Sequence, residues 1–165
     1  MLIALADWQL DVDIERTIEL SVSQGKEHCT CGYCRNFYAT LDQQYPTIRP
    51  FLARFGLEAE APDELCPYEP TIYEATYVVQ GSILHVGAQR LCIDNIPLRI
   101  SSSEQSDIYT EHPKPYFTVS IGLMELPWSL DEPMDQVISP ANEAEFLNRM
   151  QTKLLQHLSA DAISS

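Results

Sequence analysis

Alternation of apolar and polar residues indicates β-strands in the second half of the chain. The clearest example is residues 116–126, where Phe117, Val119 and Ile121 fall on one face and polar residues on the other. The expected strands are residues 71–80, 83–86, 91–93, 96–100 and 116–126. Gln80-Gly81-Ser82 predicts a turn between the first two strands. Asp94-Asn95 predicts a hairpin turn, because both residues tolerate positive φ.

The first 23 residues show the same alternation and predict a hairpin. Six apolar residues recur at every second position and would share one face: Leu2, Ala4, Ala6, Trp8, Leu10 and Val12. Residues 17–23 alternate again and predict a second strand. The acidic residues Asp11, Asp13 and Glu15 would lie at the turn between the two strands, in water.

Apolar spacings of three and four predict helices elsewhere. Residues 33–44 form the first, with Phe37 and Leu41 on one face, and residues 48–55 form a short second helix that Gly56 ends. The last helix is expected over residues 140–158, with a buried stripe made of Leu147, Met150, Leu154 and Leu158. Residues 58–70 are acidic and contain three prolines, which predicts an irregular loop.

These elements predict a single α+β domain over residues 1–165. Its parts are an N-terminal hairpin (1–23), a cysteine motif with two helices (28–56), a sheet (71–126) and a C-terminal helix (140–158). We expect a mainly antiparallel sheet of about six or seven strands. The helical pair and the C-terminal helix would cover one face, because each apolar strand face and helix stripe needs an apolar partner.

Charge narrows the classes of partner. The chain of 165 residues has 24 acidic and 10 basic residues, a formal net charge of −14. Such a surface repels phosphate backbones and anionic lipids, which argues against nucleic acid and membrane partners. The start of the chain lacks the pattern of a signal peptide, and the chain has no apolar stretch long enough to cross a membrane. We therefore expect a cytoplasmic protein with reduced thiols.

The distinctive motif is a cysteine cluster, His28-Cys29-Thr30-Cys31-Gly32-Tyr33-Cys34, with C-x-C-x2-C spacing. Zinc takes four ligands in a tetrahedron, and short spacings with a glycine let one turn present several sulfurs to one ion. The fourth ligand would be His28 or Cys66. Two other interpretations stay open. The thiols would simply fill a tight turn, or Cys34 would act as a redox nucleophile with Cys31 as the resolving thiol. In the redox interpretation, the helix N-terminus and Arg35 would lower the pKa of Cys34.

A longer stretch carries a resemblance. Residues 29–37 read Cys-Thr-Cys-Gly-Tyr-Cys-Arg-Asn-Phe, and residues 49–56 read Arg-Pro-Phe-Leu-Ala-Arg-Phe-Gly. Together with Pro67-Tyr68-Glu69-Pro70 and Pro127-Trp128, they resemble a family of short, uncharacterised bacterial proteins with a C-x-C-x2-C-R-N-[FY] motif. The resemblance implies no activity, cofactor or catalytic residue.

Catalytic motifs of other kinds are absent from the sequence. There is no glycine-rich phosphate loop and no G-x-S-x-G nucleophile elbow. His85 and His112 are expected in solvent. The leading hypothesis is therefore a non-catalytic cytoplasmic binding or interaction protein, with or without a structural zinc ion, that contacts a basic or polar protein partner. The alternatives are a thiol-dependent enzyme using Cys34, and a small-molecule binder using aromatic residues with residues 101–114 as a lid.

Overall fold

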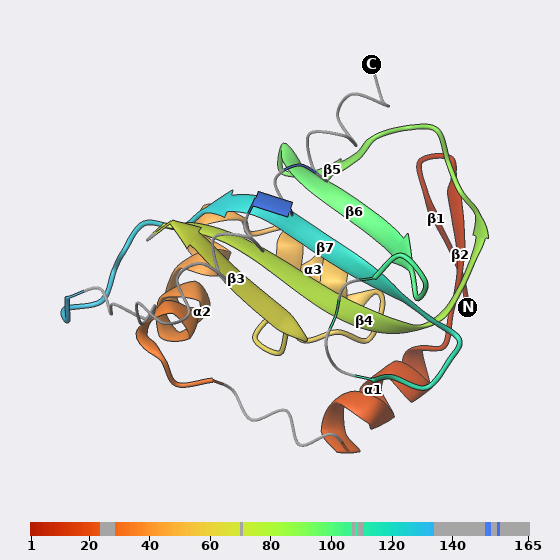
Figure 1. The fold of residues 1–165 in the computed structure, drawn as a ribbon, viewed down its shortest axis with the longest axis horizontal. Helices are drawn as coiled ribbons and strands as arrows, with labels where there is room; N and C mark the ends of the chain where they lie inside the picture. The colour runs from red at the N-terminus through yellow and green to blue at the C-terminus, as the bar shows by residue number, and fades with distance from the viewer. Residues whose placement is uncertain are drawn as a thin grey trace.

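The computed structural model describes residues 1–23, 29–69, 71–106, 108, 111–133, 151, 152 and 155. They form a seven-stranded antiparallel sheet with the order β1-β2-β4-β7-β6-β5, and β3 also pairs with β4 (Figure 1). The strands are β1 (Leu2–Leu5), β2 (Trp8–Val12), β3 (Glu64–Glu69), β4 (Ile72–His85), β5 (Leu91–Ile93), β6 (Ile96–Ser102) and β7 (Tyr116–Glu125). The helices are α1 (Ile14–Ser23), α2 (Gly32–Gln44) and α3 (Ile48–Ala53). The expected α+β class is confirmed.

The N-terminal hairpin is present, but its turn is elsewhere. Leu5 lies opposite Trp8, so Ala6 and Asp7 alone connect β1 to β2, and Ala6 has φ 51°. Across this turn the buried positions change from odd-numbered residues in β1 to even-numbered residues in β2. The buried residues are consequently Ile3, Leu5, Leu10 and Val12, while Leu2 is 74% exposed. The face predicted for residues 2–12 was therefore wrong in β1 and correct for the second half of β2.

The strand predicted over residues 17–23 is the helix α1. Asp13 stabilises its start, because its Oδ1 accepts a hydrogen bond from the backbone N of Arg16 at 2.9 Å. A Cβ added to Gly56 would lie 3.0 Å from side-chain atoms of both Ile14 and Ile18. These two isoleucines, four residues apart on one face of α1, therefore pack against the turn after α3. The period-two pattern that indicated a strand does not decide the structure here.

Residues 58–70 are not wholly irregular, because residues 64–69 form the strand β3. Pro67 lies opposite Tyr73 in this strand. Among the described residues the strand pairs only with β4, so it is an edge strand there, and proline is tolerated at an edge despite its missing N–H. The prediction of an irregular loop overlooked this exception.

The strands predicted over residues 71–80 and 83–86 are one continuous strand, β4, of 14 residues. Gly81 does not turn the chain. It has φ 147°, and a Cβ added there would lie 2.1 Å from the backbone oxygen of Asp11. Gly81 therefore allows the close approach of β2, which pairs with this half of β4.

One face of the sheet forms the hydrophobic core. In β4 and β7 it contains Tyr73, Ala75, Tyr77, Val79, Phe117, Val119 and Ile121, and the last three are the residues predicted to share a face. The helices α2 and α3 lie on this side, behind the strands in Figure 1, and contribute Phe37, Leu41, Ile48 and Leu52. Packing of the helical pair on one face of the sheet is thus confirmed. This packing fixes the first turn of α2, and with it the cysteine motif.

The opposite face of the central strands is polar but also buried. Its buried residues include Glu74 and Thr76 on β4, and Thr118 and Ser120 on β7. The hydroxyl groups of Thr76 and Ser120 lie 2.9 Å apart and form a hydrogen bond across the two strands. Alternation in the sequence predicted that these polar residues share a face, and it carried no signal for the burial of that face.

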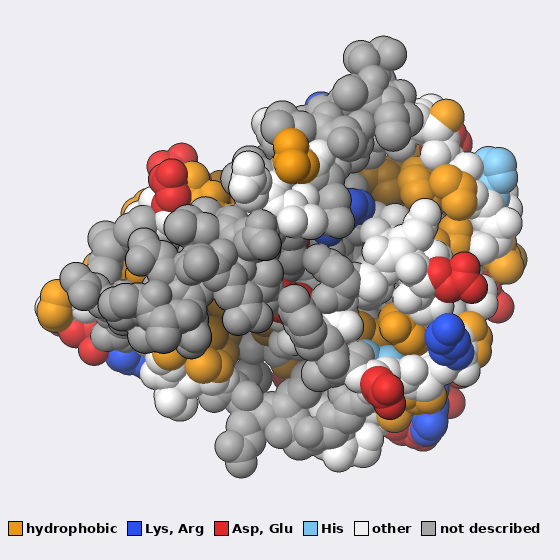
Figure 2. All heavy atoms as spheres, viewed as in Figure 1, with side chains coloured by type: hydrophobic (Ala, Val, Ile, Leu, Met, Phe, Trp, Pro, Cys, Tyr) orange, Lys and Arg blue, Asp and Glu red, His pale blue; other side chains and the backbone are white. Residues whose placement is uncertain are grey.

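The predicted C-terminal helix, residues 140–158, lies outside the described residues except for Gln151, Thr152 and Leu155, which are helical. In the described part of the chain, no helix has the length and apolar character needed to span a membrane. On the face shown in Figure 2, acidic side chains of the described residues are visible at several separate places.

Candidate metal centre

The cysteine motif forms the entry to α2. Cys31 is the N-cap residue, in extended conformation with φ −65° and ψ 158°. Its Sγ accepts a hydrogen bond from the backbone N of Cys34 at 3.5 Å, and its backbone oxygen accepts from Arg35 at 3.0 Å. The buried Gly32 follows as the first helical residue. The change from extended to helical backbone folds the motif back on itself and turns the three thiols toward one point.

The structure brings three of the predicted ligands together. The Sγ atoms of Cys29, Cys31 and Cys34 all lie within 4.8 Å of one another, the one such group of potential metal ligands among the described residues. Cys29 is exposed, and Cys31 and Cys34 are half-buried. None of the five cysteines forms a disulfide.

This separation suits a single ion. Ligands at a Zn–S distance of about 2.3 Å in a tetrahedron lie about 3.8 Å apart, so small side-chain adjustments would place all three sulfurs on one zinc ion. Thiolates are also the ligands that zinc prefers in structural sites. The residues present therefore fit three of the four ligands of such a site.

The thiols of the cluster differ in acidity. Hydrogen bonding from the backbone of Cys31 lowers the pKa of Cys29, and the thiols of Cys31 and Cys34 contribute in the same direction. Burial raises the pKa of Cys34, and the neighbouring thiols of Cys31 and Cys29 raise it further. The sequence predicted a lowered pKa for Cys34, so that expectation was wrong.

The position of Arg35 explains part of this difference. Its Nε donates a hydrogen bond to the backbone oxygen of Thr30 at 2.8 Å, and its Nη1 forms an ion pair with Glu132. The guanidinium group is thus engaged by other acceptors. Proximity in sequence alone did not place its charge where it would stabilise a Cys34 thiolate.

Tyr38 is a neighbour of the cluster that the sequence analysis missed. Burial, followed by the nearby Cys34 and Cys29 thiols, raises its pKa to about 12, and a side-chain hydrogen bond to Cys34 contributes. Tyr38 lies four residues after Cys34 in α2, on the same face of the helix. That spacing was the available signal. The hydroxyl is therefore placed to donate to a sulfur ligand.

The other cysteines and histidines are placed differently. His28 lies outside the described residues. Cys66 is on β3, where its Sγ donates to Glu64 Oε1 at 3.1 Å, and it is not a member of the three-sulfur group. Cys92 is exposed on β5. His112 was expected in solvent, but its side chain is only 3% exposed.

A set of contacts that the sequence analysis did not predict covers the first turn of α2. Tyr33 packs edge-to-face against Trp128, with ring centroids 5.8 Å apart. The buried Asn36 accepts hydrogen bonds from both Ser129 N and Ser129 Oγ, at 2.9 and 3.1 Å. The segment after β7 therefore lies directly against the helical turn that carries Cys34.

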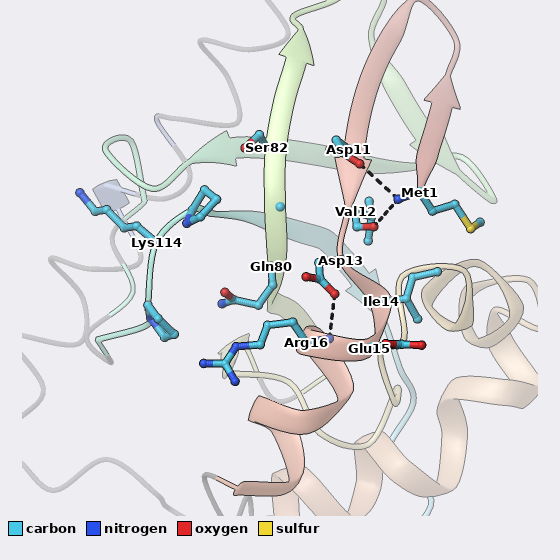
Figure 3. Close-up of a pocket in the computed structure, with 13 residues that line it drawn as sticks. Met1, Asp11, Val12, Asp13, Ile14, Glu15, Arg16, Gln80, Ser82 and Lys114 are labelled. Carbon is cyan, nitrogen blue, oxygen red and sulfur yellow. Dashed lines mark hydrogen bonds and ion pairs between the residues drawn. The ribbon is translucent and has the colours of Figure 1, made fainter.

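A groove of about 720 Å³ lies elsewhere, between β2, the start of α1, the middle of β4 and residues 113–115. Figure 3 shows its charged lining, in which Asp11, Asp13 and Glu15 accompany Arg16 and Lys114. The Met1 ammonium group contacts Asp11 Oδ1 at 3.2 Å and the Val12 backbone oxygen at 2.7 Å. Because both signs of charge line the groove, it does not indicate one class of ligand.

No family model, no curated protein and no solved structure matches this chain. The resemblance to the bacterial family with the C-x-C-x2-C-R-N-[FY] motif therefore stays a prediction.

Proposed function

We propose that this chain is a non-catalytic interaction protein whose cysteine motif binds a structural zinc ion. The observation that carries the proposal is the mutual approach of the Cys29, Cys31 and Cys34 sulfurs within 4.8 Å. The ion would hold residues 29–31 against the start of α2. The net charge of −14 supports a basic or polar protein partner.

The chain's own residues have distinct roles in this site. Three thiolates supply negative charge, and zinc, once bound, would offset most of it and cross-link the turn. The Tyr38 hydroxyl supplies a hydrogen bond to Cys34, the kind of outer contact that orients a ligand. Partial burial of Cys34 limits its access to solvent, which suits a structural rather than a reactive role.

The fourth ligand remains a choice between two residues. His28 directly precedes Cys29 in the sequence, so its use as the fourth ligand would require no rearrangement of the sheet. Cys66 lies on β3 and donates to Glu64, so its Sγ would have to leave that contact. We therefore expect His28→Ala to weaken zinc binding and Cys66→Ser to leave it unchanged.

Elemental analysis combined with thiol titration tests the proposal. The expected result is one zinc ion per chain and protection of three thiols, with rapid reaction of Cys92. Replacement of Cys29, Cys31 or Cys34 by serine should abolish stoichiometric zinc, whereas Cys92→Ser should retain it. Metal-free protein that also fails to take up added zinc would overturn the proposal.

The second candidate function is a thiol-dependent enzyme. The observation that favours it is the exposed Cys29, whose pKa is lowered, beside two further thiols. The version with Cys34 as the nucleophile has less support, because burial raises the pKa of Cys34. Alkylation rates measured against pH distinguish the two functions. An enzyme of this kind needs a thiol that reacts well below the usual cysteine pKa of about 8.5 in the purified protein.

A further inference from the structure

Residues 128–132, which we call the docking segment, rest on the first turn of α2. The indole ring of Trp128 packs on Tyr33, and both polar groups of Ser129 donate to Asn36 Oδ1. Asn36 is 0% exposed whereas Ser129 is exposed, so these hydrogen bonds are part-buried, and their acceptor is shielded from water. Trp128 Nε1 also donates to the backbone oxygen of Glu132 at 2.8 Å, which closes the segment on itself.

Arg35 joins this segment to the cysteine motif. Its Nε donates to Thr30, which lies between Cys29 and Cys31, and its Nη1 forms an ion pair with Glu132 at the far end of the docking segment. One planar guanidinium group therefore holds both partners from different nitrogens. A lysine ammonium group has a single nitrogen and cannot hold both partners in this way.

We infer that metal binding by Cys29, Cys31 and Cys34 and docking of residues 128–132 on α2 are energetically coupled through Arg35. This inference rests on the proposed function and adds regulation to it. Metal binding stabilises the docked position of residues 128–132, and a docked segment raises the affinity of the site for metal. Such coupling is reciprocal by thermodynamic necessity.

The physical origin of the coupling is how firmly residues 29–31 are held in one conformation. The backbone N of Cys34 in α2 donates a hydrogen bond to Cys31 Sγ. This hydrogen bond is long, at 3.5 Å, and sulfur is a weak acceptor. An ion that cross-links the three sulfurs would fix the Thr30 carbonyl group between them. The Arg35 side chain would then be held in position before it meets Glu132.

This prior ordering matters because the ion pair is exposed. The side chains of Arg35 and Glu132 are 42% and 40% exposed. An exposed pair gains little when two flexible side chains must be ordered together. It gains more when one of them is already held, because less conformational entropy is lost.

The first test uses the full-length chain with and without saturating zinc. Hydrogen exchange of the Ser129 amide, which donates to Asn36, should slow when zinc is bound. In a Trp8→Phe variant, in which Trp128 is the remaining tryptophan, the emission of Trp128 should change over the same zinc range. Unchanged exchange at Ser129 on metal binding overturns the coupling.

The second test measures zinc affinity by competition with a chromophoric chelator. Arg35→Lys and Glu132→Gln should each lower the affinity by about fivefold, without changing the stoichiometry of one ion. Glu19→Gln is the matched control, because it weakens the exposed Arg16–Glu19 pair on α1 and should leave the affinity unchanged.

The outcomes separate the two proposals. Zinc bound by three thiols with wild-type affinity in both variants overturns the coupling and leaves the metal site standing. Absence of zinc binding in the wild-type chain overturns both. Parallel urea unfolding of the metal-free variants distinguishes loss of coupling from general destabilisation, because coupling lowers metal affinity beyond any change in metal-free stability.

Discussion

Asp63 connects three parts of the fold through its backbone and its carboxylate. Its backbone N donates to Thr76 at 2.9 Å, and its Oδ2 accepts from the backbone N of Val78 at 2.7 Å. Its Oδ1 lies 3.2 Å from His112 Nε2, and the two side chains are 2% and 3% exposed. The pair therefore ties residues 111–115 to the centre of β4, away from competing water.

Replacement of Asp63 by alanine should be strongly destabilising. It leaves the Val78 amide and the His112 ring nitrogen without this acceptor, which should cost about 3 kcal/mol in the free energy of unfolding. Glu19→Ala, which breaks an exposed ion pair, should cost less than about 1 kcal/mol. Urea unfolding at neutral pH measures both. Equal effects of the two substitutions would contradict the structural role of the Asp63–His112 pair.

Asp7 predicts a pH dependence of stability. Hydrogen bonds from the backbone, that of Ala88 first, lower the pKa of Asp7 from its usual 3.8. Because the folded pKa lies below the unfolded one, this stabilisation is present above pH 3.8 and is lost as the pH falls further. Asp7→Asn should therefore reduce the fall in the urea midpoint on acidification from about pH 5 to pH 3. An identical pH profile in the variant would reject this contribution.

At the scale of residues, the sequence was informative where short spacing decides geometry. Cys29, Cys31 and Cys34 approach one another because they share one turn, which the C-x-C-x2-C spacing indicated. The pKa of Cys34 was not predictable in this way, because it depends on burial and on where the Arg35 side chain points. Those are properties of tertiary packing.

Among single elements, too, those decided by local sequence were predicted correctly and those decided by tertiary packing were missed. The Asp94-Asn95 hairpin turn was predicted correctly, with φ 49° and 63°, because positive φ is a local property of these residue types. Helix α1 was missed because Ile14 and Ile18 fit a helix while Ile18 and Leu20 fit a strand. Capping by Asp13 and packing against Gly56 select the helix.

The continuity of β4 depends on Gly81. A side chain there would meet the Asp11 backbone at 2.1 Å, and φ 147° is a backbone conformation that residues other than glycine rarely adopt. Gly81→Ala should therefore separate β2 from β4 and cost about 3 kcal/mol in the free energy of unfolding. Ser82→Ala, one residue along the same strand, is the control and should change it by less than about 1 kcal/mol. Urea unfolding gives both values. A stable Gly81→Ala variant would contradict the close approach of the two strands.

For the whole molecule, the cysteine motif is part of the cooperative structure rather than an appendage. It begins α2, whose Phe37 and Leu41 belong to the same hydrophobic cluster as Tyr73 of β4. Tyr73 also accepts a hydrogen bond from Asn36, one turn into α2. Ordering of the motif is therefore expected to affect the stability of the entire sheet, and not only that of its own turn.

This connection makes zinc a determinant of global stability. A ligand that binds only the folded state stabilises it by about 2.7 kcal/mol when its free concentration is 100 times the dissociation constant. Saturating zinc should therefore raise the urea midpoint of the wild-type chain, and a chelator should reverse the shift. Cys34→Ser should remove the response, whereas Cys92→Ser, in the exposed thiol of β5, should keep it. If zinc binds stoichiometrically but leaves the midpoint unchanged, the motif unfolds independently of the sheet, and the structural role proposed for the ion is wrong.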